Sequence, residues 1–115
     1  MLKKQNRLTT NFEFNITRKH GKKYQGENFF VYVLKPKNYD GETKMGIVVS
    51  NKLAKSAVLR NRVKRIFREV VRNNFEKLVG GFWIVIHPSS TALQKGYEEI
   101  SADFIKTLQK NSIPS

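Results

Sequence analysis

The sequence has no cysteine, few acidic residues and no long uninterrupted run of apolar residues. Without cysteine, the chain can form neither disulfides nor thiolate metal sites. No apolar stretch of the length of a signal peptide core or a membrane span follows the basic residues 1–10. We therefore expect a cytoplasmic protein that does not bind membranes.

The sequence motifs of common enzyme classes are also missing. The chain has no Walker loop, no dinucleotide-binding GxGxxG, no nucleophile elbow and no His/Cys spacing of a metal site. Its two histidines, His20 and His87, have no acid at a spacing that suits acid–base catalysis. We therefore expect this chain to hold no catalytic residue and no metal ligand of its own.

Positive charge is what the chain has in excess. At 115 residues and 39% hydrophobic composition it is large enough for one domain with a single core, so we assign residues 1–115 to one domain with a frayed tail at 111–115. Residues 1–75 hold 18 Lys/Arg against 5 Asp/Glu, whereas residues 76–115 hold 4 of each. This one-sided charge predicts a polyanionic partner, and nucleic acid is favoured over a membrane.

The basic excess is densest in residues 52–72, which have the periodicity of an amphipathic helix. The predicted apolar stripe consists of Leu59, Val63, Ile66, Phe67 and Val70. The opposite side consists of Asn61, Lys64, Arg65, Arg68 and Arg72, flanked by Arg60 and Arg62. Because Glu69 is the only acid between Arg60 and Arg72, most of these cations cannot be paired within the helix, and like charges one turn apart repel. Arginine can donate two hydrogen bonds to one phosphate, so we interpret this side as a ridge that faces RNA or DNA rather than an ordinary solvated face.

A first helix is predicted after residue 10. Thr10 and Glu13 form a capping-box pattern that begins it, and Gly21 ends it. Phe14 and Arg18 share one side of this helix. From the sequence, Phe14 is either a second core contact or an aromatic ring on a free face.

The remaining segments predict strands and a last helix. Residues 28–35 and 44–50 predict two antiparallel strands, with a short edge strand at 23–25, and residues 82–86 predict a buried central strand. The last helix has an apolar face that we expect in the core, formed by Tyr97, Ile100, Phe104 and Leu108.

One motif within this order resembles a known family. Arg60-Asn61-Arg62, with Lys64-Arg65 after it and Ser50-Asn51-Lys52 before it, resembles the RNR motif of the bacterial ribonuclease P protein component. The likeness extends along nearly the whole chain through Asn6-Arg7-Leu8, Phe14, Lys19-His20-Gly21, Phe30-Val31-Tyr32, Met45-Gly46-Ile47-Val48-Val49-Ser50 and the final strand and helix.

The resemblance implies a fold and a function. The fold would be an α+β sandwich of order α-β-β-β-α-β-α, like a domain of a small-subunit ribosomal protein, with a four-stranded sheet and a left-handed βαβ crossover. The chain would be the protein subunit of ribonuclease P, an endoribonuclease that removes the 5′ leader from precursor tRNA. Catalysis would belong to the RNA subunit, with Mg²⁺ held mainly by that RNA and the substrate, and no obligate protein partner is expected.

The resemblance also assigns residues to two RNA-binding surfaces. The residues that would bind the RNA subunit are Arg60, Asn61, Arg62, Lys64, Arg65, Arg68 and Arg72. The residues that would bind the leader, in a cleft between the first helix and the sheet, are Phe14, Arg18, Phe30, Tyr32, Lys52 and Lys55. Relatives often carry an aromatic residue at position 18 and basic residues at position 51 and around positions 87–88, where this chain has Arg18, Asn51 and His87-Pro88. The alternative is a stand-alone RNA- or ribosome-binding protein without a role in tRNA maturation.

Overall fold

Strand β4 (Trp83–Pro88) lies in the interior of a four-stranded sheet and organises the fold. The structure, a computed structural model, describes residues 3–113. The sheet has the order β1-β2-β4-β3. Its other strands are β1 (Lys22–Gln25), β2 (Phe29–Leu34) and β3 (Lys44–Ile47).

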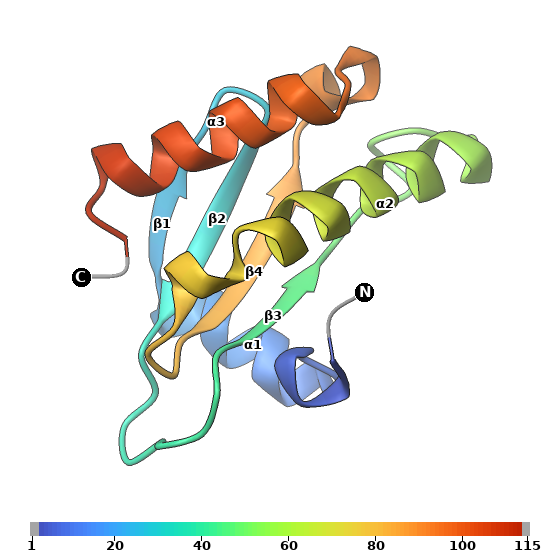
Figure 1. The fold of residues 1–115 in the computed structure, drawn as a ribbon. Coiled ribbons are helices and arrows are strands. Elements are labelled where there is room, and N and C mark those ends of the chain that lie inside the picture. Colours follow the sequence, from blue (N-terminus) through green and yellow to red (C-terminus); the bar gives the residue numbers. More distant parts are fainter. Residues whose placement is uncertain (1–2, 114–115) are drawn as a thin grey trace.

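Three helices cover the two faces of the sheet (Figure 1). Helices α2 (Ala57–Asn73) and α3 (Tyr97–Lys110) pack side by side on one face, and α1 (Asn11–His20) lies on the other. Short 3₁₀ turns at Lys4–Asn6, Phe75–Leu78 and Ser90–Gln94 complete the elements. This arrangement confirms the predicted α+β sandwich and its element order.

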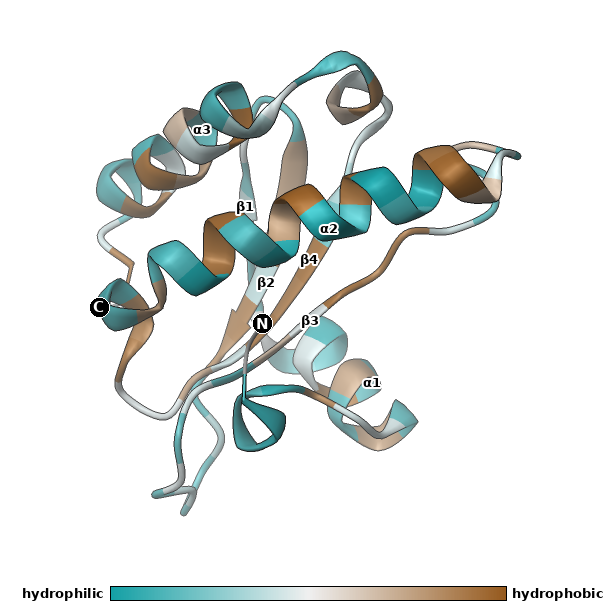
Figure 2. Cartoon of the chain, turned by 45° about the vertical axis from the view of Figure 1, so that its right-hand side comes forward, coloured by the Kyte–Doolittle hydropathy of each residue, from teal (hydrophilic) through white to brown (hydrophobic). Residues whose placement is uncertain are grey.

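The core lies between the sheet and helices α2 and α3. Phe29 of β2 is fully buried and contacts Phe67 of α2 and Phe104 of α3, with ring centroids 5.8 and 5.9 Å apart. Alternate residues of each strand point to this core, so Val31 faces it while Phe30 and Tyr32 point to the side of α1. Figure 2 shows the same division along α2, where apolar and polar segments alternate at helical spacing.

The pairing of β3 corrects one prediction. We expected residues 44–50 to pair antiparallel with residues 28–35, but β4 lies between these two strands. β3 pairs in parallel with β4, with Met45 opposite Ile84, and β2 pairs antiparallel with β4, with Phe30 opposite His87. The turn residues between β2 and β3 indicate a change of direction but do not reveal that a later strand occupies the place beside β2.

The connection from β3 through α2 to β4 is left-handed. In Figure 1, β3 and β4 both point upward, α2 passes in front of the sheet, and the chain moves leftward from β3 to β4. Right-handed crossovers account for about 98% of such connections, so this hand is rare. It is the hand that the family resemblance implies.

Helix boundaries agree with most predictions. The capping box of α1 is present, because Thr10 Oγ1 accepts from the Glu13 N–H and Glu13 Oε1 accepts from the Thr10 N–H. The basic helix is shorter than the stretch 52–72, since α2 begins at Ala57, after the N-cap Ser56. Residues 52–55 form its preceding connection because no side chain in them supplies a cap.

The predictions for Leu59, Tyr97 and Ile113 need correction. Leu59 and Tyr97 are 41% and 38% exposed, so neither belongs to the core. Tyr97 instead accepts a hydrogen bond from Asn73 of α2 through its hydroxyl. Ile113, predicted in the frayed tail 111–115, packs against the core, while residues 114 and 115 lie outside the described residues.

Candidate RNA-binding surfaces

The side of α2 that faces away from the sheet carries cations that are free to meet an external anion. The buried side of α2 consists of Val63, Phe67, Val70 and Val71. Because this side anchors the helix to the core, Lys64, Arg65 and Arg68 lie on the opposite side. Across residues 3–113, no carboxylate lies within 4.0 Å of the charged nitrogens of these three residues. We call Lys64, Arg65 and Arg68 the basic ridge.

Arg72 differs from the basic ridge because it has an acidic partner. Its Nη2 donates to Glu69 Oε2 at 2.8 Å, and both side chains are almost half exposed. This hydrogen bond is the main reason that the pKa of Glu69 lies below its usual value. An exposed pair of this kind is weak, so a phosphate can compete for Arg72.

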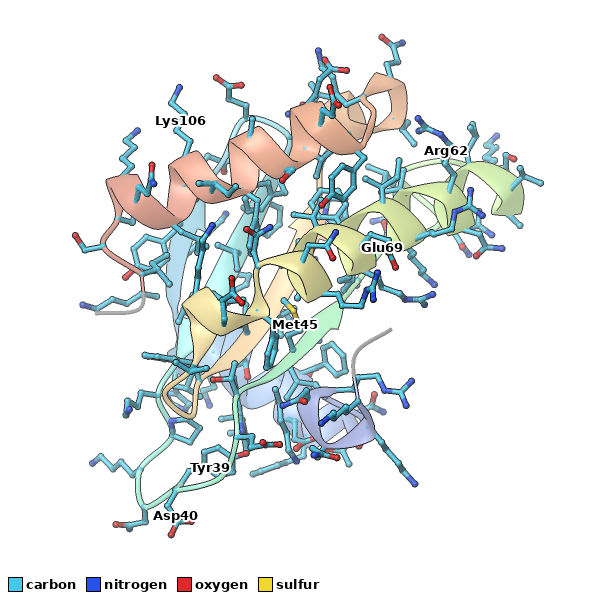
Figure 3. All side chains as sticks on the ribbon, viewed as in Figure 1. Tyr39, Asp40, Met45, Arg62, Glu69 and Lys106 are labelled. Carbon is cyan, nitrogen blue, oxygen red and sulfur yellow. The ribbon has the colours of Figure 1, made fainter. Side chains whose placement is uncertain are left out.

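Arg60 and Arg62 also differ from the basic ridge, because they donate to the protein's own backbone. Arg60 Nη1 donates to the carbonyls of Ala54 and Lys55 at 2.7 and 2.8 Å. Arg62 donates to the carbonyls of Leu93 and Lys95, which precede α3, at 3.3 and 3.0 Å. In Figure 3, Arg62 lies on the half of α2 nearest the start of α3. Each guanidinium retains further N–H donors, so these contacts order the neighbouring loops and leave some capacity for RNA.

The second surface is an aromatic cluster on the sheet face that α1 partly covers. The rings of Phe30 and His87, directly opposite each other on β2 and β4, are stacked at 4.8 Å with an interplanar angle of 7°. Tyr32 meets both rings edge to face, with centroids 5.9 and 5.8 Å away. Lys23 Nζ lies 4.4 Å from the Phe30 ring centroid. Rings beside a cation are the arrangement on which single-stranded bases stack.

The surroundings of His87 in this cluster favour its neutral form. Burial lowers the pKa of His87, and the nearby positive charges of Arg18 and Lys23 lower it further. Its Nε2 atom is buried and has no hydrogen-bond partner within the part of the chain that the structure describes. The ring therefore acts as a third member of the aromatic surface rather than as a cation.

Phe14 has features of both predicted roles, that of a core residue and that of a free aromatic ring. Its half-buried ring covers Gly46 of β3 so closely that a Cβ built on Gly46 would lie 2.3 Å from the ring. Arg18, one turn later, donates through Nη2 to Asn15 Oδ1 at 2.9 Å. Phe14 and Arg18, the two predicted leader-binding residues of α1, thus both lie beside the sheet, but the ring of Phe14 packs against β3.

Lys52 and Lys55 are exposed in the connection between β3 and α2. This connection leaves the sheet at the end where β4 carries His87 and Pro88, because β3 and β4 are parallel and the Val48 N–H donates to the Ile86 carbonyl. The contact from Arg60 to the Lys55 carbonyl ties the same connection to α2. Both lysines therefore lie beyond the end of the sheet at which His87 of the aromatic cluster lies.

Two functional candidates, His87 and Lys23, were missed as site residues. The alternation of β4 carries the signal for His87, since Trp83, Val85 and His87 share one side of the strand. Their assignment to a common surface with Phe30 needed the β2–β4 register, which the sequence does not reveal. Lys23 lies beside these rings because β1 pairs with β2, with Gln25 opposite Phe30 and Lys23 opposite Tyr32.

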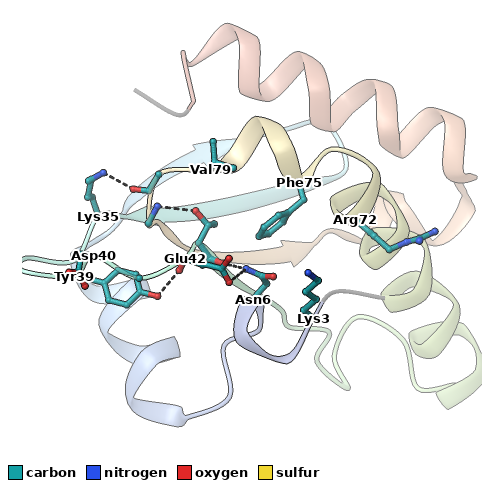
Figure 4. A pocket seen from close by; sticks show the side chains of 13 residues that line it. Lys3, Asn6, Lys35, Tyr39, Asp40, Glu42, Arg72, Phe75 and Val79 are labelled. Atoms are coloured by element: carbon teal, nitrogen blue, oxygen red, sulfur yellow. Dashed lines mark hydrogen bonds between the residues drawn. The ribbon is translucent and has the colours of Figure 1, made fainter.

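The hollow drawn in Figure 4 is lined by no residue of the basic ridge or of the aromatic cluster. It has a volume of about 730 Å³ and adjoins the loop between β2 and β3. Glu42 lies in it and accepts from Asn6, and Tyr39 donates to the Glu42 carbonyl. Arg72 is the predicted site residue on its wall. Its lining combines the carboxylates of Asp40 and Glu42 with the cations Lys3, Lys35 and Arg72, so its charge does not favour a polyanion as clearly as the basic ridge does.

Residues 3–113 show neither a metal-binding cluster nor a membrane-spanning helix. Within residues 3–113, no group of three or more His, Cys, Asp or Glu side chains is placed to hold a metal ion. Over the same range, none of the helices combines the length and apolar character needed to cross a bilayer.

Comparison with known proteins identifies a consistent set of relatives. A model of the Ribonuclease P family matches residues 2–112. The ribonuclease P protein component of Pseudanabaena sp. is 34% identical over 98% of this chain and 97% of its own, and that of Finegoldia magna is 35% identical over 92% and 90%. The RNase P protein structure from Staphylococcus aureus has a TM-score of 0.83 at 27% identity and covers 97% of this chain and 100% of its own. That from Thermotoga maritima has a TM-score of 0.77 at 29% identity, covering 90% and 96%.

Proposed function

The chain belongs to the family of ribonuclease P protein components, and from this membership we propose how its two surfaces divide the binding of RNA. As a member it is the protein subunit of ribonuclease P, an endoribonuclease of tRNA processing, and acts with the RNA subunit. Our proposal is that the basic ridge binds the RNA subunit and that the aromatic cluster, with α1, holds the 5′ leader of precursor tRNA.

The basic ridge carries the first half of the proposal. The half-buried Lys64 and the exposed Arg65 and Arg68 lie together on one side of α2, without acidic partners among residues 3–113. A row of cations that repel one another destabilises its own helix by a few tenths of a kcal/mol per pair. Binding of a phosphate backbone removes this repulsion and releases counterions, so RNA is the partner that this ridge favours.

The aromatic cluster supports the second half. Phe30, Tyr32 and His87 offer ring surface, and Lys23 and Arg18 place positive charge beside it. Stacking on such rings is worth about 1–3 kcal/mol per base and needs bases that are not already paired. A single-stranded leader meets this requirement, whereas the folded body of a tRNA does not.

We infer that the reacting groups are supplied by the RNA. The gathering of carboxylates and histidines that a protein nuclease needs for its metal ions is not found in residues 3–113. Mg²⁺ would thus be held mainly by the RNA subunit and the substrate. We further propose that the protein works in the cytoplasm, without an obligate protein partner, because both of its surfaces are built for RNA.

The first prediction tests this function by reconstitution. The purified protein should restore precursor tRNA cleavage to a ribonuclease P RNA at a low Mg²⁺ concentration, at which the RNA alone is inactive. Arg65→Ala should weaken assembly and lower the slope of log affinity against log salt by about one, the contribution of one phosphate contact.

The control for Arg65 is Lys110→Ala, which removes an exposed cation from the last turn of α3. It should leave both the slope and the cleavage rate nearly unchanged. An Arg65→Ala slope equal to that of wild type would show that the ridge does not face the RNA subunit. Equal affinity for ribonuclease P RNA and for mixed tRNA would instead favour a general RNA-binding protein.

A further inference from the structure

A small hollow opens at the free edge of β3, between the N-terminal segment, α1 and α2. It has a volume of about 240 Å³. Leu8, Phe14, Met45 and Ile47 supply its apolar walls. Met45, labelled in Figure 3, marks the strand at which the hollow lies. The N-terminal segment is held there because the Leu8 N–H donates to the Met45 carbonyl at 3.0 Å.

Two arginines from distant parts of the chain line this hollow. Arg7 comes from the N-terminal segment and Arg68 from the basic ridge, and both are exposed. Within residues 3–113, neither guanidinium has a hydrogen bond to the protein or a carboxylate within 4.0 Å. The hollow therefore combines an apolar interior with two uncompensated positive charges.

These features fit one nucleotide better than other ligands. Drug-sized molecules occupy pockets of about 300–1,000 Å³, so a hollow of 240 Å³ suits a smaller group such as one base. The ring of Phe14 and the side chain of Ile47 provide the apolar contact that a base seeks. Arg7 and Arg68 provide planar donors for the phosphate attached to it.

The position of the hollow points to the RNA subunit as the source of that nucleotide. Arg68 belongs to both the hollow and the basic ridge, so an RNA strand bound along the ridge passes the hollow. Contacts to phosphates alone are independent of sequence and cannot distinguish one RNA from another. An unpaired base inserted beside the ridge would supply this distinction, as is usual for proteins that read structured RNA.

We propose that the hollow between Arg7, Phe14 and Arg68 binds one unpaired nucleotide of the RNA subunit, with its base against Phe14 and Ile47 and its phosphate between the two arginines. This inference rests on the proposed assignment of the ridge to that RNA. It adds a contact to an unpaired base and gives Arg7 a role in RNA recognition.

The test is base-by-base chemical probing of a ribonuclease P RNA, without precursor tRNA, at saturating protein. Reagents that modify the Watson–Crick edges of unpaired bases should find one base protected by the wild-type protein. Arg7→Gln and Arg68→Gln should both make the same base reactive again, because each removes one side of the phosphate contact. Affinity for the RNA should fall by roughly 3- to 10-fold in Arg7→Gln.

Two matched variants separate this site from general charge. Lys4→Gln removes an exposed cation from the same N-terminal segment but does not line the hollow, and it should leave affinity within about twofold of wild type. Lys64→Gln removes a ridge cation outside the hollow, so it should weaken binding while the base remains protected at saturation. Circular dichroism of each variant checks that the fold is retained.

The outcomes distinguish this inference from the proposed function. If wild type binds ribonuclease P RNA and no base depends on Arg7 and Arg68, the nucleotide site is wrong and the proposed function stands. If wild type neither binds that RNA nor restores cleavage, the proposed function fails. If precursor tRNA is added and the dependent base lies in its leader, the hollow takes a leader nucleotide and the assignment to the RNA subunit is overturned.

Discussion

At the scale of single residues, the arginines of α2 form two groups according to the atoms that they contact. Arg65 and Arg68 belong to the basic ridge, whereas Arg60 and Arg62 donate to backbone carbonyls at either side of the helix. Arg60 and Arg62 of the RNR triplet thus also stabilise the fold, which their charge alone does not indicate. Arg62 holds the segment before α3 against α2, and Arg60 holds the connection that carries Lys55.

Arg62→Ala should lower the free energy of unfolding by about 1–2 kcal/mol, because two charge-assisted hydrogen bonds to half-buried carbonyls are lost. Urea unfolding followed by the fluorescence of Trp83, the only tryptophan, measures this change. Lys64→Ala, also a half-buried cation of α2, is the control and should change the midpoint little. Equal midpoints for the two variants would contradict the structural role of Arg62.

His87 gives the protein a pH-dependent stability. Its folded-state pKa is lowered from 6.5, so below that pH the unfolded chain binds the proton more readily and folding becomes less favourable. Arg18 and Lys23 oppose the imidazolium, and Phe30 and Tyr32 offer it no acidic partner. His87→Phe keeps a ring for the stack on Phe30 but removes the titration.

Wild type should therefore lose more stability than His87→Phe when the pH falls from 7.5 to 5. Urea midpoints at the two pH values measure the difference. His20, exposed at the end of α1, is present in both proteins and does not contribute to the difference between them. The same pH-dependent loss in both proteins would mean that the burial of His87 does not control its protonation.

At the scale of elements, the position of α1 on the sheet depends on the close contact between the Phe14 ring and Gly46. Phe14 covers Gly46, where a side chain would lie 2.3 Å from the ring. Glu13, one residue earlier, accepts from Lys44 Nζ at 3.2 Å. Burial by itself would raise the pKa of Glu13, but the Thr9 and Thr10 N–H groups and Lys44 outweigh it and keep the pKa low. These contacts fix the rotation of α1 and leave Phe12, on its outer side, 66% exposed.

Gly46→Ala should displace Phe14, with a stability loss of about 1–3 kcal/mol from overpacking. The control is the same substitution in Phe14→Ala, where the ring is absent and the added methyl group has room. There Gly46→Ala should cost little, which a double-mutant cycle measures as a coupling energy. Independent effects of the two substitutions would show that the ring does not rest on Gly46.

At the scale of the whole molecule, the groups that we propose bind RNA lie in two layers. The basic ridge lies on one side of the sheet, on α2, and the aromatic cluster lies on the other, beside α1. The hollow with Arg7 and Arg68 opens at the β3 edge between the two layers. The hollow around Glu42 lies at the loop between β2 and β3, and its lining mixes acidic and basic side chains.

Local patterns in the sequence determined the helices, most strands and the existence of a basic helical side. The Thr10–Glu13 capping box, the apolar spacing of Val63, Phe67 and Val70, and the apolar run at residues 82–86 each depend on neighbours within a few residues. Periodicity reports such short-range preferences well, and they appear in the structure with shifts of a few residues. Family resemblance added the element order and the rare hand of the crossover.

Tertiary structure alone decided which residues share a surface. The insertion of β4 between β2 and β3 brought His87 opposite Phe30, and no pattern within either strand predicts that register. The same packing turned Arg60 and Arg62 toward backbone carbonyls and brought Arg7 beside Arg68, which is 61 positions away in the sequence. Contacts between distant segments depend on how whole elements pack, because burial of apolar surface is not directional and does not specify partners along the chain.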